Sequence, residues 1–503
     1  MSKVNATNGN NLMAVCLRGC SWVGLGSLSA QILRMLRLWF LTYLLAPGDL
    51  GILTLVWCVF ALLQELSDTG MKHALIQNPN GHNRHYLDNA WLLNLMRNVL
   101  LYGILYLTAP YIANGLYQKP ELQQVLRLAG TIFLLDAFTS VSLILLQKQL
   151  QFKRITLVTL AGNAANLLAT VLFLLHGQEI RGAVFGEIIG AFTIWALSYF
   201  IHPYRPRLHW HRIAGKELLG YGVMVYLATL LDAFGLRLDI LILGFIAANQ
   251  DVGIYGLGMA AVMAPCSILS LLIVSVGFPA LSLVQHNRQA VRRGAAEITK
   301  AVQSLAGPLF ALLFLLGPDL VKILPIKYAP TGVVIRWLSL YGFTVVSLRQ
   351  ISPALYAIRK VHWFVLRGLL NILLQAVLII PLYRKYGLAG ACWAANITFL
   401  ITTVLIWAVA LRELRWSWRQ WIQDTAGILW AWLAGGLCFA AACLVLHHMR
   451  YPWSAHLPAR LLATLLGLLT YAAGYYRYYY RNTRIPPLAP AADDALLPAR
   501  ELE

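Results

Sequence analysis

Nine basic side chains fall inside stretches of the sequence that otherwise have the composition of membrane-spanning helices. A cation in the hydrocarbon core of a membrane costs at least about 2.5–3.5 kcal/mol, so these residues are not expected to face lipid. We expect them to line a hydrated cavity inside the helix bundle, and a cationic cavity suits an anionic cargo. The nine residues are Arg34, Arg37, Lys72, Arg97, Arg127, Arg237, Arg336, Arg349 and Arg367.

Five of these arginines are the candidate binding residues. Arg34 and Arg37 are three residues apart near the middle of the first apolar stretch, so they share a helix face with Gln31. A guanidinium binds two phosphate oxygens at once and stays charged at any working pH. The set therefore predicts a diphosphate ligand, and its members are Arg34, Arg37, Arg237, Arg349 and Arg367.

Structural ion pairing is the alternative explanation for the embedded cations. Six acidic residues also lie in the apolar stretches, which leaves an excess of three positive charges after complete pairing. Arg237 lies two residues from Asp239, although residues with this spacing do not face each other on a helix. Lys72, Arg127 and Arg336 lie near the ends of their stretches, where long cationic side chains can reach the headgroups. The six acids are Glu65, Asp68, Asp136, Glu187, Asp232 and Asp239.

Three of these acids are candidates for carrying a coupling ion. Carboxylates at the middle of a membrane bind protons or Na⁺ in pumps and exchangers. The candidates are Asp232, Asp239 and Asp68, and the alternative role of Asp68 is a helix-terminal cap, because Asp68-Thr69-Gly70 resembles a bend. We expect no metal or organic cofactor, and only H⁺ or Na⁺ as a coupling ion.

The composition is that of a membrane protein. Of 503 residues, 59% are hydrophobic and 12% are charged, whereas soluble domains carry about 25% charged residues. The net charge of +20 comes from basic residues scattered through short loops and helices, which argues against nucleic acid as a partner. The 7 cysteines include no CxxC pair, and the chain has no G-x-S-x-G, Walker A or H-E-x-x-H motif, so we do not expect an enzyme.

Fourteen segments are apolar over about the 20 residues that a membrane-spanning helix needs. Positively charged loops remain in the cytoplasm, so loop charge orients the spans. With the N-terminus in the cytoplasm, 23 Lys and Arg residues of the loops and tails fall on the cytoplasmic side and 8 on the other. This bias predicts that both termini are cytoplasmic. The predicted spans are 20–45, 51–75, 88–112, 123–146, 155–176, 182–201, 219–245, 253–283, 301–317, 333–357, 361–383, 387–411, 424–446 and 460–476.

The two halves of the chain resemble each other. The tetrapeptide DLGI (49–52) follows the first span, and DVGI (251–254) follows the seventh, 202 residues later. Asn163 and Asn371, 208 residues apart, each precede a Gly-Ala pair by 19 residues. In both cases the second copy lies six spans after the first. Because six is an even number, the two halves have the same orientation in the membrane, as in transporters built from parallel repeats. The sequence thus predicts an N-terminal six-helix lobe (1–218), a C-terminal six-helix lobe (219–415), two additional spans (416–480) and a disordered cytoplasmic tail (481–503).

Eight stretches, in this order, resemble the polysaccharide-exporter branch of the multidrug/oligosaccharidyl-lipid/polysaccharide transporter superfamily, the Wzx-type flippases. The resemblance covers residues 15–415 and implies two six-helix lobes around a cationic central cavity. It also implies a cargo of undecaprenyl-diphosphate-linked sugar repeat units, and a cavity role for Arg34, Arg37 and Arg237. The stretches are LLAPGDLGILTL (44–55), ELSDTGMKHALIQ (65–77), YQKPELQQVLRLAG (117–130), LQKQLQFKRI (146–155), YRPRL (204–208), RLDILILGFI (237–246), DVGIYGLGMA (251–260) and VGFPALSLVQ (276–285).

We therefore expect an all-α polytopic protein of the bacterial inner membrane with about fourteen spans, which flips a lipid-linked oligosaccharide for surface polysaccharide export. Its partners would be the lipid-linked oligosaccharide and membrane lipids, with a polysaccharide polymerase and a chain-length regulator. One alternative is a lipid II flippase, which the sequence barely separates from this function. A cation-coupled multidrug exporter is disfavoured by the excess positive charge, and a membrane polymerase or ligase by the short outer loops.

Overall fold

The computed structural model of the protein describes residues 9–67, 71, 75, 81–149, 151–211, 223–273, 277, 281, 287–358, 360–423, 425 and 457–482. This part of the chain is built of helices, mostly α-helices with short π and 3-10 turns. The helices are α1 (Gly9–Leu44), α2 (Pro47–Leu66), α4 (Arg84–Pro110), η1 (Tyr111–Leu116), α5 (Pro120–Phe138), α6 (Ser142–Lys148), α7 (Phe152–Leu175), α8 (Glu179–Ile201), α10 (Val223–Gly235), α11 (Leu238–Ile246), α12 (Asn249–Leu272), α14 (Arg288–Leu320), η3 (Val321–Ile323), η4 (Ile326–Tyr328), α15 (Thr331–Ala357), α16 (His362–Glu413) and α18 (Leu457–Asn482).

Most of these helices are long and apolar enough to cross a membrane. Among the described residues eight pass this test, or nine if the bent pair α5 and α6 counts as one span. One of them, α16, contains two predicted spans, which meet at Gly387, where a φ of 60° suits glycine. The other predicted spans have described helices as counterparts, except the thirteenth (424–446), which like the tail from residue 483 lies outside the described residues. The predicted fold class, an all-α polytopic membrane protein, is confirmed.

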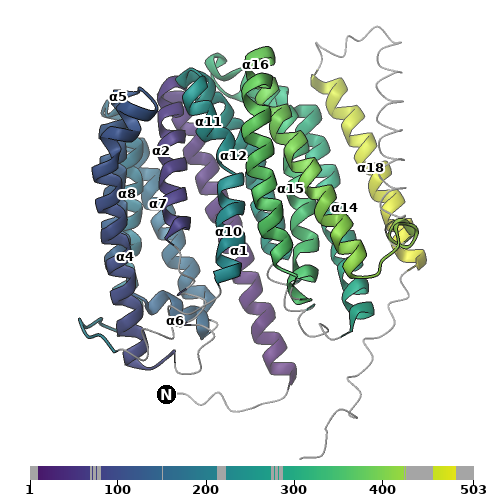
Figure 1. Cartoon of the computed structure of the whole chain (residues 1–503), viewed down its shortest axis with the longest axis horizontal. Coiled ribbons are helices and arrows are strands. Elements are labelled where there is room, and N and C mark those ends of the chain that lie inside the picture. The colour runs from purple at the N-terminus through teal and green to yellow at the C-terminus, as the bar shows by residue number, and fades with distance from the viewer. Residues whose placement is uncertain are drawn as a thin grey trace, which may run out of the picture.

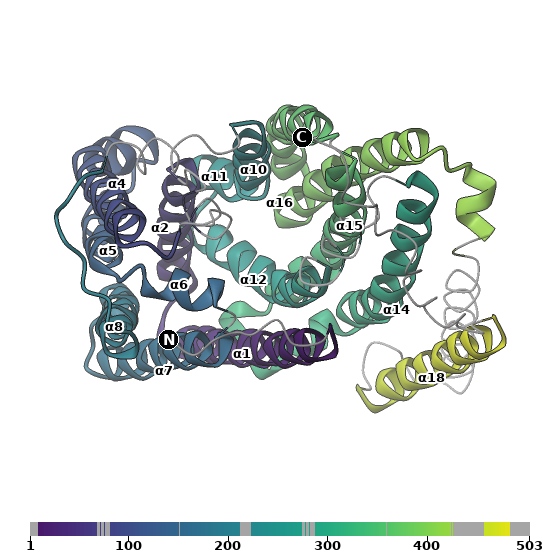
Figure 2. The same ribbon diagram turned by 90° about the horizontal axis from the view of Figure 1, so that it is seen from below.

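The helices stand side by side in one bundle (Figure 1), and we group them by chain order. We call α1 to α8 the N-lobe and α10 to α16 the C-lobe. In the N-lobe α7 packs on α8 and α4 on α5, and in the C-lobe α15 packs on α12, α14 and α16. Figure 2 shows α12 between α2 of the N-lobe and α15 of the C-lobe, with α18 set apart beside α14.

The two lobes meet where α2 crosses α12. A Cβ atom on Gly51 would overlap the carbonyl oxygen of Asn249, and one on Gly253 would overlap that of Pro47. Only glycine allows these backbones to approach so closely. Gly51 and Gly253 belong to the DLGI and DVGI tetrapeptides, so the two copies of the repeated motif pack against each other. We call this region, at the upper end in Figure 1, the crossing end.

Two predicted spans differ from straight helices. The fourth bends by 60° between α5 and α6. The seventh is broken at Leu236 and Arg237, between α10 and α11, where Arg237 has φ −124° and ψ −5°. Apolar composition predicts that a segment crosses the membrane but does not predict such a break, because both halves remain apolar.

Candidate functional site

Arg34 projects from α1 as an exposed side chain. Its Nη2 atom donates a hydrogen bond of 2.8 Å to Oε1 of Gln31, one helical turn earlier. Among the described residues Arg34 forms no contact ion pair, although the charge of Glu187, which pairs with Arg37, also acts on it. Its guanidinium therefore keeps donors available for a ligand.

An apolar groove between the lobes is lined in part by Gln31, the residue to which Arg34 is hydrogen-bonded. The volume of the groove is about 770 Å³. On the N-lobe side the spacing of Leu28, Ile32, Met35 and Trp39 places them on one face of α1. The C-lobe side is formed by Ala261, Ala264, Pro265, Ile268 and Leu269 of α12 and by Leu309 and Leu313 of α14. The arrangement joins a cation to an apolar groove through Gln31.

Arg37 has different surroundings from Arg34 although both were predicted on one helix face. It forms an ion pair with Glu187 of α8 and donates a 3.0 Å hydrogen bond to Oδ1 of Asn166 on α7. The side chains of Arg37 and Glu187 are 17% and 28% exposed. Arg37 thus links α1 to the interior of the N-lobe.

Arg367 is closed off inside the C-lobe. It is 2% exposed, pairs with Asp232 of α10 and lies over the ring of Phe399, with its Cζ atom 5.1 Å from the ring centroid. Its contacts are those of a structural cation in this conformation, and it is not among the residues that line the groove near Arg34.

Arg237 and Arg349 complete the predicted set. Arg237 precedes α11 and donates a 3.3 Å hydrogen bond from Nη1 to the carbonyl of Ala233, in the last turns of α10. Arg349 on α15 is half-buried and donates a 2.7 Å hydrogen bond to Oγ of Ser270 on α12. The five arginines therefore belong to separate surroundings, two in the N-lobe and three in the C-lobe.

The acids expected near Arg237 have other recorded partners. Asp232 pairs with Arg367. Asp239 is buried and accepts hydrogen bonds from the Tyr255 hydroxyl, at 2.6 Å, and from the Ile240 amide, at 2.8 Å. The third candidate for ion coupling, Asp68, lies outside the described residues. Among the described residues, no group of three or more His, Cys, Asp or Glu side chains is arranged to hold a metal ion.

Three of the four remaining embedded cations, Arg97, Arg127 and Arg336, have local partners. Arg127 lies over the Tyr106 ring at 4.4 Å, and Arg336 donates a 3.2 Å hydrogen bond to the carbonyl of Phe314. Arg97 donates a 3.5 Å hydrogen bond to Asn94, and Lys72 lies outside the described residues.

A polar stripe on α16 was missed by the sequence interpretation. Asn371 and Gln375 are each 1% exposed, and their amide groups have no hydrogen-bond partner among the described residues. With Arg367 they form a series at intervals of four residues, so they share one helix face. A Cβ atom on Gly235 would overlap Oδ1 of Asn371, which places this stripe against the break between α10 and α11. The interval of four in an apolar span was the available signal.

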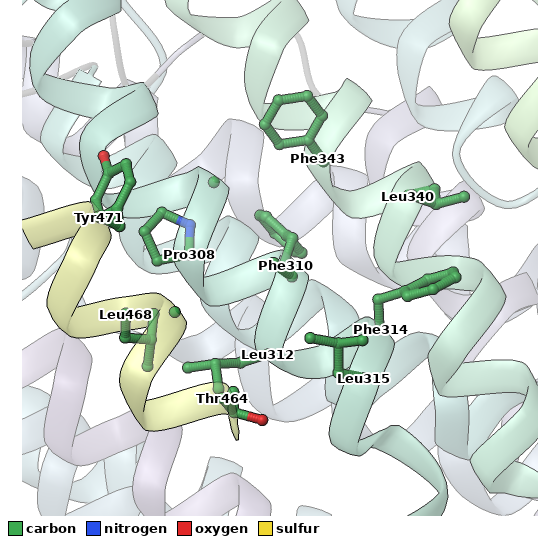
Figure 3. Close-up of a pocket in the computed structure, with 13 residues that line it drawn as sticks. Pro308, Phe310, Leu312, Phe314, Leu315, Leu340, Phe343, Thr464, Leu468 and Tyr471 are labelled. Atoms are coloured by element: carbon green, nitrogen blue, oxygen red, sulfur yellow. The ribbon is translucent and has the colours of Figure 1, made fainter. Parts of the chain in front are cut away.

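A second apolar cavity, of about 410 Å³, lies between α14, α15 and α18 (Figure 3). Phe310, Phe343 and Leu468 line it, and Tyr471 of α18 lies near Pro308 of α14. The Tyr471 hydroxyl donates a 3.0 Å hydrogen bond to the carbonyl of Ser304. None of the candidate arginines lines this cavity, so it is separate from the site beside Arg34.

Comparison with known proteins identifies the family. The family model described as "Polysaccharide biosynthesis protein" matches residues 40–325, more than half of the chain. The chain belongs to this family. The suspected resemblance to polysaccharide exporters is thereby confirmed.

Two curated relatives of the chain are biosynthesis proteins by name. The chain is 24% identical over 301 residues to the teichuronic acid biosynthesis protein TuaB of Bacillus subtilis, and the match covers 58% of this chain and 61% of TuaB. It is 22% identical over 278 residues to the lipopolysaccharide biosynthesis protein WzxC of Escherichia coli, and the match covers 55% of this chain and 56% of WzxC. The matches thus span about three fifths of the relatives' length.

Solved structures establish the fold. The lipid II flippase MurJ, in an inward closed conformation, superposes with a TM-score of 0.69 over 91% of this chain and 98% of MurJ, at 13% identity. An inward-facing multidrug resistance MATE family transporter of the MOP superfamily superposes with a TM-score of 0.64 over 78% of this chain and 98% of that transporter, at 14% identity. The polysaccharide biosynthesis family member therefore has the fold of these transporters.

Proposed function

We propose that this protein is a flippase that moves undecaprenyl-diphosphate-linked oligosaccharide repeat units across the inner membrane for O-antigen, capsule or exopolysaccharide export. The observation that carries the proposal is the exposed Arg34 beside the apolar groove between the lobes. A lipid-linked oligosaccharide has an anionic diphosphate joined to a long apolar chain. The cation and the groove match these two parts.

The surroundings of the arginines and of the groove indicate which part of the cargo each would bind. Among the described residues the Arg34 guanidinium makes no contact ion pair, so it can bind two phosphate oxygens without breaking one. The groove walls contribute apolar side chains from both lobes, so an apolar chain can lie between α1 and α12 while remaining close to lipid. Arg237 and Arg349 would contact the headgroup only after rearrangement, and Arg37 and Arg367 mainly hold the lobes in shape.

Relatives support this class of cargo. The names of TuaB and WzxC refer to the synthesis of teichuronic acid and lipopolysaccharide, both of which are surface glycopolymers. The lipid II flippase MurJ shares the fold, and a lipid II cargo would place the same demands on Arg34 and on the groove. Family membership favours polysaccharide repeat units over lipid II.

A cation-coupled multidrug exporter is the weaker alternative. MATE transporters share the fold, which does not by itself decide the cargo. A cationic drug would be repelled by Arg34 and Arg37, because in the described part of the chain the two arginines share the single nearby carboxylate of Glu187, which pairs with Arg37. The proposal therefore has an anionic cargo and no catalytic step.

Orientation and partners follow from charge and pathway. The bias of loop Lys and Arg, 23 against 8, would place both termini in the cytoplasm. The crossing end would then be periplasmic. A polymerase and a chain-length regulator would receive the repeat units there.

Ion coupling is part of the proposal. Asp232 and Asp239 lie on α10 and α11, on either side of the break, and protonation or Na⁺ binding at Asp232 would weaken its pair with Arg367. Such a change would alter the packing of α10 on α16. If imposed pH and Na⁺ gradients do not change the flipping rate, ion coupling is contradicted. The protein would then be a facilitator that moves its cargo without a coupling ion.

Binding measurements on purified protein in nanodiscs test the role of Arg34. Undecaprenyl diphosphate is titrated against the wild type and the Arg34→Ala, Arg34→Lys and Arg127→Ala variants. We expect Arg34→Ala to raise Kd about tenfold, because one charge-assisted interaction of about 1.4 kcal/mol is lost. Lysine should restore part of the affinity, since a point charge cannot replace the fork.

The Arg127→Ala variant is the matched control. Arg127 is another embedded arginine, but it lies on α5 over the ring of Tyr106 of α4 and does not line the groove. Its replacement should leave Kd unchanged. Equal affinity of wild type and Arg34→Ala would remove Arg34 from the cargo site.

A further inference from the structure

Each lobe begins with a span that ends at the crossing end. In the N-lobe this is α1, which ends at Leu44 and is followed by the extended residue Ala46 and by Pro47. In the C-lobe it is α11, which ends at Ile246 and is followed by the extended residues Ala247 and Ala248. The last carbonyls of a helix lack an intrahelical partner and carry the negative end of the helix dipole.

A lysine of the C-lobe binds the end of the first N-lobe helix. Lys327, in the short turn η4, donates a 2.6 Å hydrogen bond from Nζ to the carbonyl oxygen of Leu45. The Tyr328 hydroxyl donates a second hydrogen bond, of 3.1 Å, to the same oxygen. Tyr43 returns the contact, because its hydroxyl donates a 2.7 Å hydrogen bond to the carbonyl of Ile323.

A lysine of the N-lobe binds the end of the first C-lobe span in the same way. Lys119, between η1 and α5, donates a 2.9 Å hydrogen bond from Nζ to the carbonyl oxygen of Gly244 in the last turn of α11. Tyr117 stacks on Phe245, with 4.4 Å between ring centroids. Lys119 is half-buried, and this burial lowers the pKa of its ammonium.

The two contacts are related by the internal repeat. Lys119 follows the third span and Lys327 the ninth, and they are 208 residues apart, the same separation as Asn163 and Asn371. Each lysine reaches across to the other lobe, and each binds the end of that lobe's first span. A chance surface contact would not recur at the repeat-related position.

We propose that Lys119 and Lys327 form a reciprocal latch that holds the crossing end shut and must release whenever this end opens. The latch rests on the proposed function, because flipping requires the lobes to separate at this end. The hydrogen bond from a lysine ammonium to a helix carbonyl is strong enough to stabilise a closed state. It is also weak enough to be replaced by hydrogen bonds to water. The glycines Gly51 and Gly253 allow α2 and α12 to pack closely, and the two lysines hold this closed arrangement by their hydrogen bonds.

Distances between spin labels test the latch without any cargo. The labels are attached at Gln178→Cys and Arg384→Cys in a background without other cysteines. Both positions are exposed and lie at the crossing end: Gln178 shares a cavity wall with Asp49, and the neighbouring Tyr383 donates a hydrogen bond to Asp251. Double electron–electron resonance then gives the ratio of separated to closed lobes.

Methionine replacement removes the ammonium and keeps the length of the side chain. We expect Lys119→Met or Lys327→Met to raise the ratio of open to closed molecules about threefold, and the double variant about tenfold. Lys→Arg at both positions should restore the wild-type ratio, because the donor and the charge remain.

Lys322→Met is the matched control. Lys322 lies on the same surface as Lys327 but pairs at 2.7 Å with Asp319 of its own lobe. Its replacement should leave the ratio unchanged. An unchanged ratio in the double variant, or an equal shift in Lys322→Met, would overturn the latch.

The latch and the proposed function fail in different ways. If the double variant shifts the distances and neither protein flips a lipid-linked oligosaccharide, the cargo is wrong and the latch stands. If the wild type flips the cargo and the double variant keeps both the wild-type distances and the wild-type rate, the latch is wrong and the proposed function stands.

Discussion

At the scale of single residues, the chemistry of an arginine here depends on its partner rather than on its depth. Arg34 and Arg37 are three residues apart, yet in the described part of the chain Arg34 is hydrogen-bonded to Gln31 whereas Arg37 pairs with Glu187. The sequence predicted both cations and their span. It could not predict their difference, because Glu187 is 150 residues away in the chain.

The ion pair of Arg37 predicts a structural effect. Arg37→Met leaves the half-buried Glu187 carboxylate without its cation, so we expect a loss of stability of roughly 1–3 kcal/mol. Glu187→Gln in the same molecule should recover part of this loss. Thermal unfolding in detergent of the two single variants and the double variant measures each loss of stability as a lowered Tm.

Additive losses in that cycle would contradict the pairing. The outcome also separates the two arginines, because Arg34→Ala should leave the Tm near the wild-type value while weakening cargo binding. An Arg37→Met variant with wild-type Tm would instead return Arg37 to the candidates for cargo contact.

At the scale of elements, hydrophobicity predicted the spans well and their interruptions poorly. Thirteen of the fourteen predicted spans have described helices as counterparts, because length and apolar composition are read directly from the sequence. The break between α10 and α11 depends on contacts with α16, which lies more than a hundred residues later. The same contacts bring Asp232 to Arg367 instead of to Arg237.

The contact at this break can be tested by a suppressor. A Cβ atom on Gly235 would overlap Oδ1 of Asn371, so we expect Gly235→Ala to destabilise the protein by about 1–3 kcal/mol through overpacking. Asn371→Ala in the same molecule should relieve the overlap and restore part of the stability. Tm and the yield of folded protein report both effects.

Gly103→Ala provides the comparison for that experiment. Gly103 lies inside α4, and a Cβ atom there would meet nothing within 4 Å. Alanine at this position should be neutral or slightly stabilising, since it favours the helix. If Gly235→Ala lowers the Tm and the double variant with Asn371→Ala has the same lowered Tm, the overlap with Asn371 is not the cause.

At the scale of the whole molecule, the repeat is the feature that the sequence revealed most directly. The DLGI and DVGI tetrapeptides suggested two related halves, and in the structure their glycines lie where the backbones of α2 and α12 approach most closely. The repeat did not reveal that Lys119 and Lys327 reach across this contact, because as loop cations they resembled ordinary determinants of topology. Their acceptors are backbone carbonyls, which leave no signal in the sequence.

Flipping in reconstituted vesicles tests the central claim most directly. Undecaprenyl-diphosphate-linked oligosaccharide is placed in both leaflets of vesicles that contain the purified protein, and an impermeant glycosidase added outside measures how much becomes accessible with time. We predict nearly complete cleavage with the wild type, a much slower second phase with Arg34→Ala, and a wild-type rate with Arg127→Ala. Cleavage that stops at the outer-leaflet fraction with the wild type, as in vesicles without protein, would contradict the account.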